Sequence, residues 1–246
     1  MGIPLIKERK SEAVRGYHHG DYELRRRFCR FLLKTIGFTL MVRMERVDGL
    51  ENIPKTGPAI LMMNHIGFVD PIILVHTAPR HIVPLAKVEA YDYPLVGIFP
   101  KLWGVIPVVR KNVDRRVISQ ALEVLRAGEI LLVAPEGTRN PALHSPREGA
   151  VYLASRGNAP IVPVALEQTR GFPTYPFSKR WRGPGAIVRY GRPFRFRDEF
   201  QRARSEDLKK MSDEAMYVLA AMLPADRRGE FSDLSRATQD TIEWVS

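Results

Sequence analysis

The sequence predicts an α/β fold, in which a single domain with a largely parallel or mixed central sheet is flanked by helices and follows a basic amphipathic helical segment. Three observations predict it. The 246 residues are 45% hydrophobic and 26% charged, which is close to the globular average and enough for one sizeable core. From about residue 58, short apolar runs alternate with segments of helical periodicity. The excess of basic residues is confined to two short blocks, which indicates a nearly neutral body with two cationic surfaces.

Apolar runs predict the strands of the body. In chain order they are Ala59–Met63, Ile82–Ala86, Val105–Val109, Glu129–Ala134 and Ile161–Leu166. Proline cannot donate to a strand ladder, so Pro84 indicates an edge strand or a bulge and Pro163 a bulge. Residues 186–197 are expected to form a pair of strands.

Helical periodicity and capping residues predict the intervening helices. The first starts at Asp70-Pro71, with Asp70 as N-cap and Pro71 in the first turn. The next two cover about residues 112–128 and 147–157, each stopping at a glycine near its end. A last amphipathic helix covers roughly residues 205–223.

The net charge of +11 comes from the two basic blocks. Residues 1–43 hold ten Lys or Arg against four Asp or Glu, and residues 170–204 hold ten against two. A strongly basic protein suits a polyanionic partner, which leaves nucleic acid, an anionic membrane surface and a phosphorylated substrate open. The single cysteine, Cys29, excludes an intramolecular disulfide and indicates a reducing compartment.

The first block contains a basic amphipathic helix, and we set the boundary between this segment (1–44) and the body (45–246) after it. At 100° per residue, one arc carries Arg26, Arg27, Arg30 and Lys34, and the opposite arc carries Leu24, Phe28, Phe31, Leu32 and Thr35. Only eight uncharged residues separate Lys34 from Arg43, far fewer than the ~20 apolar residues of a spanning helix. The pattern favours a helix in a membrane interface, docked by Arg26, Arg27, Phe28, Arg30, Phe31 and Lys34. The alternative is an ordinary surface helix that packs its apolar face on the body.

The second block interleaves arginines with aromatic residues, which leaves three interpretations. Such a surface suits single-stranded nucleic acid, or a membrane interface where rings lie at headgroup level and arginines meet phosphates. The third interpretation is a pair of strands with solvated arginines, which must hold for much of 186–197. No zinc-ligand spacing or ribonucleoprotein-type motif accompanies the block, so we expect no nucleic-acid partner.

The loops after the strands are expected to carry the chemistry, because the carboxyl ends of parallel strands meet at one edge of a sheet. The first such loop holds His65 and Asp70, with four residues between them. This spacing lets the carboxylate accept a hydrogen bond from one ring nitrogen, which leaves the other nitrogen free to take a proton. The alternative is a structural His65 and an Asp70 that only caps its helix.

Cations follow the later strands. Arg110 follows the third strand, and the run Pro135-Glu136-Gly137-Thr138-Arg139 follows the fourth. Gly137 lets the backbone approach a ligand, Arg139 offers a planar fork for phosphate, and Glu136 could hold a hydroxyl or position Arg139. The alternative is an ordinary turn with a surface arginine. The sequence contains no phosphate loop, dinucleotide fingerprint, nucleophile elbow or metal-ligand spacing, so these residues suit direct transfer of a group onto a substrate hydroxyl.

Four segments together resemble the glycerolipid acyltransferase family, most closely the 1-acylglycerol-3-phosphate acyltransferases. In family order they are Asn64-His65…Asp70 (an N-H-x4-D block), Gly104–Arg110, Pro135–Arg139 (P-E-G-T-R) and Ile161–Val164. A lysine-bearing segment, Ala86-Lys87-Val88-Glu89, lies between the first two, and order and spacing agree over roughly residues 45–200. Gly67 and Ala134 depart from the family, whose members often have Ser and Phe there.

The resemblance implies a glycerol-3-phosphate acyltransferase-like fold and a reaction at a lipid hydroxyl. His65, oriented by Asp70, would deprotonate the hydroxyl of a lysophospholipid acceptor, which then attacks the thioester of acyl-CoA or acyl-carrier protein. Arg110, Arg139 and Lys87 would hold the acceptor phosphate, while Glu136, Gly137 and Thr138 shape the acceptor site. No metal or other cofactor is implied.

Location and alternatives follow from the same resemblance. The enzyme is expected at the cytoplasmic face of an anionic membrane, as a peripheral or monotopic protein. The alternatives are an acyltransferase for another lysolipid or glycerol acceptor, and a non-catalytic basic protein that binds lipid or nucleic acid.

Overall fold

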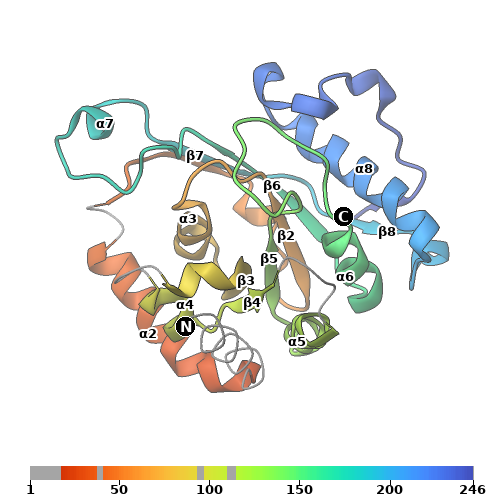
Figure 1. Ribbon diagram of the computed structural model, residues 1–246, viewed down its shortest axis with the longest axis horizontal. Helices are drawn as coiled ribbons and strands as arrows, with labels where there is room; N and C mark the ends of the chain where they lie inside the picture. The colour runs from red at the N-terminus through yellow and green to blue at the C-terminus, as the bar shows by residue number, and fades with distance from the viewer. Residues whose placement is uncertain (1–17, 38–40, 93–96, 110–114, 246) are drawn as a thin grey trace, which may run out of the picture.

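The computed structural model describes residues 18–37, 41–92, 97–109 and 115–245 (Figure 1). Nine strands of these residues form one mixed sheet, in the order β1-β7-β6-β2-β5-β3-β4, with β8 on β6 and β9 on β8. The strands are β1 (Met44–Asp48), β2 (Ala59–Met63), β3 (Ile82–Lys87), β4 (Ile106–Val108), β5 (Ile130–Val133), β6 (Ile161–Glu167), β7 (Ala186–Tyr190), β8 (Phe194–Phe196) and β9 (Ile242–Trp244).

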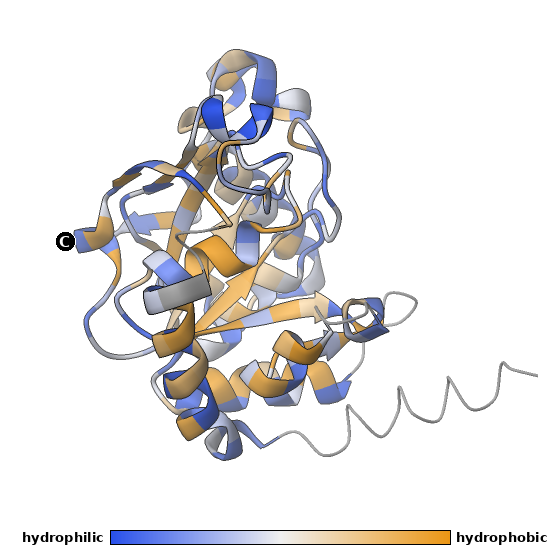
Figure 2. Cartoon of the chain, turned by 90° about the vertical axis from the view of Figure 1, so that its left-hand side faces the viewer, coloured by the Kyte–Doolittle hydropathy of each residue, from blue (hydrophilic) through white to orange (hydrophobic). Residues whose placement is uncertain are grey.

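The helices divide between the two faces of the sheet. They are α2 (Glu23–Leu32), α3 (Asp70–Thr77), α4 (Ile98–Trp103), α5 (Arg115–Arg126), α6 (Gly149–Gly157), α7 (Lys179–Arg182) and α8 (Ser205–Ala221). One buried cluster joins the sheet to α5, α6 and α8, and a second joins its other face to α2, α3 and α4 (Figure 1). The central strands are hydrophobic along their length, as a strand covered on both faces requires (Figure 2). Short 3₁₀ or π turns lie at His19–Tyr22, Leu33–Gly37, Leu50–Asn52, Val88–Asp92, Asp198–Phe200, Ala225–Arg227, Gly229–Phe231 and Leu234–Arg236.

The parallel pairing positions the site. Strand β2 lies between β5 and β6 and runs parallel to both, and β3 is parallel to β5 and β4. The loops that follow these five strands therefore leave the sheet at one edge. The predicted fold class is confirmed, and the ends of the predicted strands and helices agree with the structure to within a few residues, whereas β1, α4, α7 and β9 were not predicted.

Three local expectations are corrected. Strand β3 is interior, but at Pro84 it pairs with β5 alone, since pairing with β4 begins at Leu85. Strands β7 and β8 do not pair with each other, because both pair with β6, and Pro163 lies without a bulge opposite Met62. Asp70 is the first residue of α3, and its carboxylate turns back to the preceding loop instead of capping the helix.

Helix α2 turns part of its cationic arc toward the body. Arg26 is buried and donates from Nε to the carbonyl of Trp103 (2.7 Å) and from Nη2 to that of Gly104 (3.2 Å), at the carboxyl end of α4. Arg30 donates to the carbonyl of Ala78, just after α3. Guanidinium groups suit these positions because the last carbonyls of a helix have no partners inside it. The prediction that Arg26 docks on a membrane is therefore wrong, whereas Arg30 is only half-buried and its docking role stays a prediction.

The opposite side of α2 is exposed and apolar. Helix α4 packs beside α2 and adds two exposed side chains to this apolar face, which we define as Leu24, Phe28, Phe31, Ile98 and Leu102. Arg27 and Lys34 are exposed at its margin. Hydrophobic and charged residues alternate along the helices at the lower edge of Figure 2. No helix in the described ranges is long and apolar enough to cross a bilayer.

Much of the second basic block, residues 170–204, makes contacts within the fold. Its strand aromatics Tyr190, Phe194 and Phe196 are core residues. Between β6 and β7 the chain leaves the sheet in a loop that carries α7, and Arg180 stacks on Phe172, with its guanidinium carbon 3.8 Å from the ring centroid. Tyr175 and Phe177, near the tip of the loop, are exposed.

Candidate functional site

His65 and Asp70 face each other after β2. Nδ1 of His65 and Oδ2 of Asp70 are 2.8 Å apart, which is the contact that the sequence spacing predicts. The carboxylate is fully buried, while the imidazole keeps 19% exposure. With Nδ1 protonated and donating to Asp70, Nε2 is left as the acceptor that a base requires.

The turn between β2 and α3 places Asp70 for this contact. Its Oδ2 atom also accepts from the backbone N–H groups of Ile66 (2.7 Å) and Gly67 (2.8 Å). Pro71 in the first turn of α3 has no N–H to leave unpaired, so the helix can start directly after the aspartate. The turn is therefore folded around one carboxylate oxygen, which fixes the side chain that orients His65.

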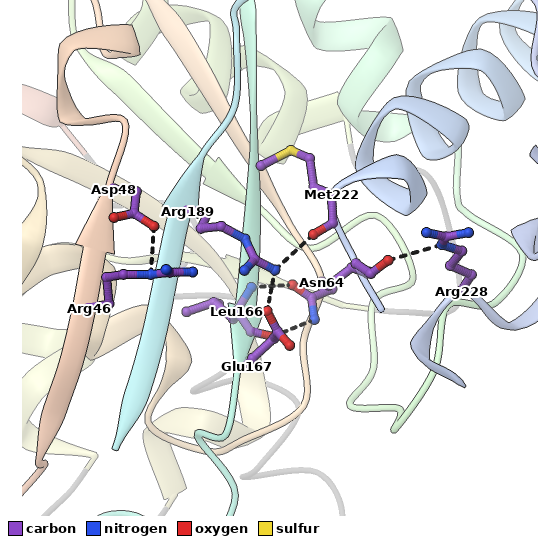
Figure 3. A network of polar contacts seen from close by, with 9 residues as sticks. Arg46, Asp48, Asn64, Leu166, Glu167, Arg189, Met222 and Arg228 are labelled. Carbon is purple, nitrogen blue, oxygen red and sulfur yellow. Dashed lines mark hydrogen bonds and ion pairs between the residues drawn. The ribbon is translucent and has the colours of Figure 1, made fainter. Parts of the chain in front are cut away.

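Asn64 clamps the end of β2 to β6. Its Nδ2 donates to the carbonyl of Leu166 (2.9 Å), and its Oδ1 accepts from the N–H of the same residue (2.8 Å; Figure 3). The next residue of β6, Glu167, binds Arg189 of β7, which also donates to the carbonyl of Met222 after α8 (2.9 Å). The His65 loop is thus held to the sheet through Asn64, a role that was not predicted from the sequence.

The loop after β5 folds against the His65 loop. Asn140 donates its backbone N–H to the carbonyl of His65 (2.8 Å). Buried Glu136 accepts at Oε1 from the N–H of His144 (2.8 Å) and from Nδ2 of Asn140 (3.3 Å). Burial raises the pKa of the Glu136 carboxyl, and these hydrogen bonds oppose the rise. Glu136 therefore organises its own loop, whatever further contact it makes with a ligand.

Two arginines lie on this loop. The Arg139 guanidinium carbon is 5.8 Å from the ring centroid of Phe68, two residues before Asp70, and the arginine is exposed. Arg147, which the sequence reasoning did not select, places Nε 3.4 Å from the position a Cβ on Gly137 would take. Both arginines are exposed on the loop that packs against the His65 loop, and a guanidinium is suited to bind an anion.

The remaining predicted residues are spread along the same edge. Thr138 lies in the turn before Arg139, and Lys87 is the last residue of β3. Arg110 follows β4 directly but lies outside the described residues. The structure therefore brings together His65, Asp70 and the loop of residues 135–147, with Lys87 two strands away at the same edge.

Comparison with known proteins identifies the family. A family model described as Acyltransferase matches residues 45–167, half of the chain. The chain belongs to the Acyltransferase family. This confirms the resemblance found in the sequence, and the matched range runs from the second residue of β1 to the end of β6.

Individual relatives share this region. The 1-acyl-sn-glycerol-3-phosphate acyltransferase of Borreliella burgdorferi is 35% identical over 51% of this chain and 52% of its own length. That of Bacillus subtilis is 34% identical over 57% and 70%, and the alpha enzyme of Ovis aries 30% identical over 65% and 56%. The chain thus spans about half the length of two of these curated relatives.

A solved structure confirms the fold. The crystal structure of the 1-acyl-sn-glycerophosphate (LPA) acyltransferase from Thermotoga maritima matches with a TM-score of 0.55 and 21% identity, over 77% of each chain.

Asn64, Asn140 and Arg147 are the site residues whose structural roles were missed. Asn64 adjoins His65 in sequence, which is a signal that could have found it. Asn140 and Arg147 close the loop through backbone hydrogen bonds. The N–H of Asn140 donates to the carbonyl of His65, and the N–H of Arg147 donates to that of Pro135 (2.8 Å). No sequence spacing encodes such contacts.

Proposed function

We propose that this member of the Acyltransferase family transfers an acyl group from an acyl thioester to the free hydroxyl of 1-acylglycerol-3-phosphate, giving phosphatidic acid. The observation that carries the proposal is a histidine held by a buried carboxylate, with a neighbouring loop that bears two arginines, on a chain whose relatives are named for that activity.

The proposed mechanism is direct transfer. Nε2 of His65 removes the proton from the acceptor hydroxyl, and Asp70 stabilises the imidazolium that forms. The hydroxyl oxygen attacks the thioester carbonyl carbon, and the carbon–sulfur bond then breaks. The departing thiolate takes the proton from His65 and leaves as the free thiol. The donor is acyl-CoA or acyl-carrier protein, and the chemistry calls for no metal or other cofactor.

Arg139 is the proposed grip on the acceptor phosphate, with Arg147 on the same loop and Arg110 and Lys87 as further cations of the same edge. A guanidinium binds phosphate through two parallel hydrogen bonds, which also orients the ligand. Gly137 and Thr138 would line the glycerol part of the acceptor. Glu136 would act there through the loop that it holds together.

We further propose that the enzyme docks on the cytoplasmic face of an anionic membrane, as a peripheral or monotopic protein. The apolar face of α2 and α4 supports this, since its rings and aliphatic side chains are exposed and flanked by the cations Arg25, Arg27 and Lys34. In this arrangement the acceptor lipid remains in its leaflet while the water-soluble donor approaches from solution.

The test is thiol release from acyl-CoA with 1-acylglycerol-3-phosphate in anionic vesicles, comparing wild type with His65→Ala. Base catalysis contributes typically 10²–10⁴-fold, so we expect at least a 100-fold loss of kcat. His18→Ala, an exposed histidine outside the site, is the matched control and should retain full activity. A His65→Ala rate within tenfold of wild type would refute the assignment.

The acceptor is tested separately. Lysophosphatidylcholine and glycerol-3-phosphate replace 1-acylglycerol-3-phosphate in the same assay, and acyl-carrier protein replaces CoA. We expect the highest kcat/KM with 1-acylglycerol-3-phosphate. A higher value with another acceptor would reassign the substrate while leaving the His65 mechanism in place.

A further inference from the structure

Two buried polar atoms next to His65 have no hydrogen-bond partner among the described residues. One is Oδ1 of Asp70, the carboxylate oxygen that does not face the histidine, and the other is Oγ1 of Thr169. Both side chains are fully buried. A buried carboxylate oxygen without a donor is costly, and a nearby hydroxyl is a group that can supply one.

Asp70 Oδ1 and Thr169 Oγ1 both lie close to the Cα of Gly67, on the side where a Cβ would be. A Cβ built on this glycine would lie 2.7 Å from Thr169 Oγ1 and 3.0 Å from Asp70 Oδ1, and also 3.0 Å from the Thr169 carbonyl oxygen. Real Cβ atoms essentially never show a contact of 2.7 Å, so Thr169 occupies the room that a side chain at position 67 would need. The absence of a Cβ is what lets Thr169 reach this side of Asp70.

The sheet holds Thr169 in position. It follows the end of β6 by two residues, and β6 is clamped to β2 by the paired hydrogen bonds between Asn64 and Leu166. The carbonyl of Thr169 accepts from the N–H of Phe172 (3.3 Å), which turns the chain away after it. Thr169 is therefore presented to Asp70 by the same clamp that holds His65.

We propose that Thr169 is a positioning residue for the His65–Asp70 pair. Its hydroxyl lies near Oδ1 of Asp70 without a hydrogen bond to it in this structure, and it donates to that oxygen through one water molecule or after a rotation about χ1. Gly67 is required to admit it. Asp70 then has donors on both oxygens, and its carboxylate plane is fixed relative to the imidazole. The expected loss of kcat rests on the proposed function, whereas the geometry of Thr169, Gly67 and Asp70 does not depend on it.

The first test removes the hydroxyl without changing the shape. In Thr169→Val we expect kcat to fall about 10- to 100-fold with the KM for the acceptor unchanged, because a hydrogen bond to a charged group is lost. Thr169→Ser keeps the hydroxyl and should stay within about threefold of wild type. A Thr169→Val kcat above half that of wild type, or equal losses in both variants, would overturn the proposal.

The second test asks whether a side chain at position 67 and the side chain of Thr169 compete for the same space. We expect Gly67→Ser alone to be poorly folded or inactive, and Gly67→Ser with Thr169→Ala to melt at a higher temperature than Gly67→Ser, because the 2.7 Å contact is gone. The serine hydroxyl should also raise kcat above that of Thr169→Ala alone. Gly149→Ser, where nothing lies within 4 Å of the added Cβ, is the matched control. Strictly additive effects of the two substitutions would contradict the pairing.

The third readout does not depend on activity. The His65 Nδ1 proton, held by Asp70, should give a downfield proton resonance in wild type and Thr169→Ser that shifts or exchanges faster in Thr169→Val. An unchanged resonance in folded Thr169→Val would overturn the positioning role. If wild type fails to acylate any acceptor, the proposed function fails, and this resonance still decides the role of Thr169.

Discussion

Substituting Phe28 and Phe31 by serine should release the protein from vesicles without unfolding it. Each ring is 62% exposed on the outward side of α2, so its removal leaves the packed side of the helix in place. An aromatic side chain offers about 150–250 Å² of surface, of which roughly 100–150 Å² is exposed here. At about 25 cal/mol per Å², each ring contributes roughly 2.5–4 kcal/mol on insertion.

The expected result for the Phe28→Ser/Phe31→Ser double variant is a fall of at least about 100-fold in the vesicle partition coefficient, since 1.4 kcal/mol is tenfold. The assay is flotation with vesicles containing anionic lipid, and a thermal melt checks the fold. A double variant that partitions within about threefold of wild type would show that this face is not the docking surface.

Arg26→Met should lower stability without weakening vesicle binding, the opposite of the Phe28→Ser/Phe31→Ser variant. Arg26 makes two hydrogen bonds to the end of α4 from a buried position, and a charged hydrogen bond is worth about 1.5–3 kcal/mol. We expect about 2–4 kcal/mol less stability in urea unfolding, while the folded fraction still binds vesicles. Deleting residues 1–43 would confound both effects, because it removes the docking face and the Arg26 cap together.

Three further predictions concern the site and its surroundings. Arg139→Ala should raise the KM for the acceptor about 10- to 100-fold with little change in kcat, as steady-state kinetics would show. Glu136→Gln can still accept from His144 and Asn140, so it should keep at least half of the wild-type kcat, whereas Glu136→Ala should lose about tenfold or more. Burial, with Arg30 and Arg26 nearby, lowers the pKa of His81 to about 4, so the unfolded chain binds a proton below pH 6.5 that the folded chain does not. Stability should therefore fall by about 1–3 kcal/mol as the pH drops from 6.5 to 4, and His81→Phe should flatten this slope in urea unfolding.

Each of the three has a result that contradicts it. If Arg139→Ala changes only the apparent affinity for the thioester, its phosphate grip is wrong; Arg156→Ala, an exposed arginine on α6, is the control. Equal losses in Glu136→Gln and Glu136→Ala would mean that the charge itself contacts the substrate. His19 and His76 also have pKa values lowered by burial, so only the difference between wild type and His81→Phe measures His81.

The strands and the His65–Asp70 contact were predictable because they depend on local patterns. An apolar run such as Ala59–Met63 predicts a buried strand, and the carboxyl ends of parallel strands share an edge whatever their order. A five-residue step from histidine to aspartate across a turn also allows a short distance. The spacing alone left a structural His65 open, and the resemblance over residues 45–200 favoured the contact.

The orientation of α2 was not predictable in the same way. Periodicity shows that Arg26 and Phe28 lie on different sides of the helix, but not which side meets the body. The outcome depends on the free carbonyls at the ends of α3 and α4, which accept from Arg30 and Arg26. Those partners lie 48 and 77 residues away in sequence, so no local pattern encodes them.

The central place of β2 also constrains how the chain is made. Ile60 pairs with Ile161, about 100 residues later, and with Leu131 on its other side. At a synthesis rate of about 5–20 residues per second, β2 leaves the ribosome roughly 5–20 s before β6 is available. Until then this wholly apolar strand, with His65 just beyond it, lacks one of its two neighbours in the sheet. The nascent chain is therefore most open to aggregation, and most dependent on chaperones, in its first half.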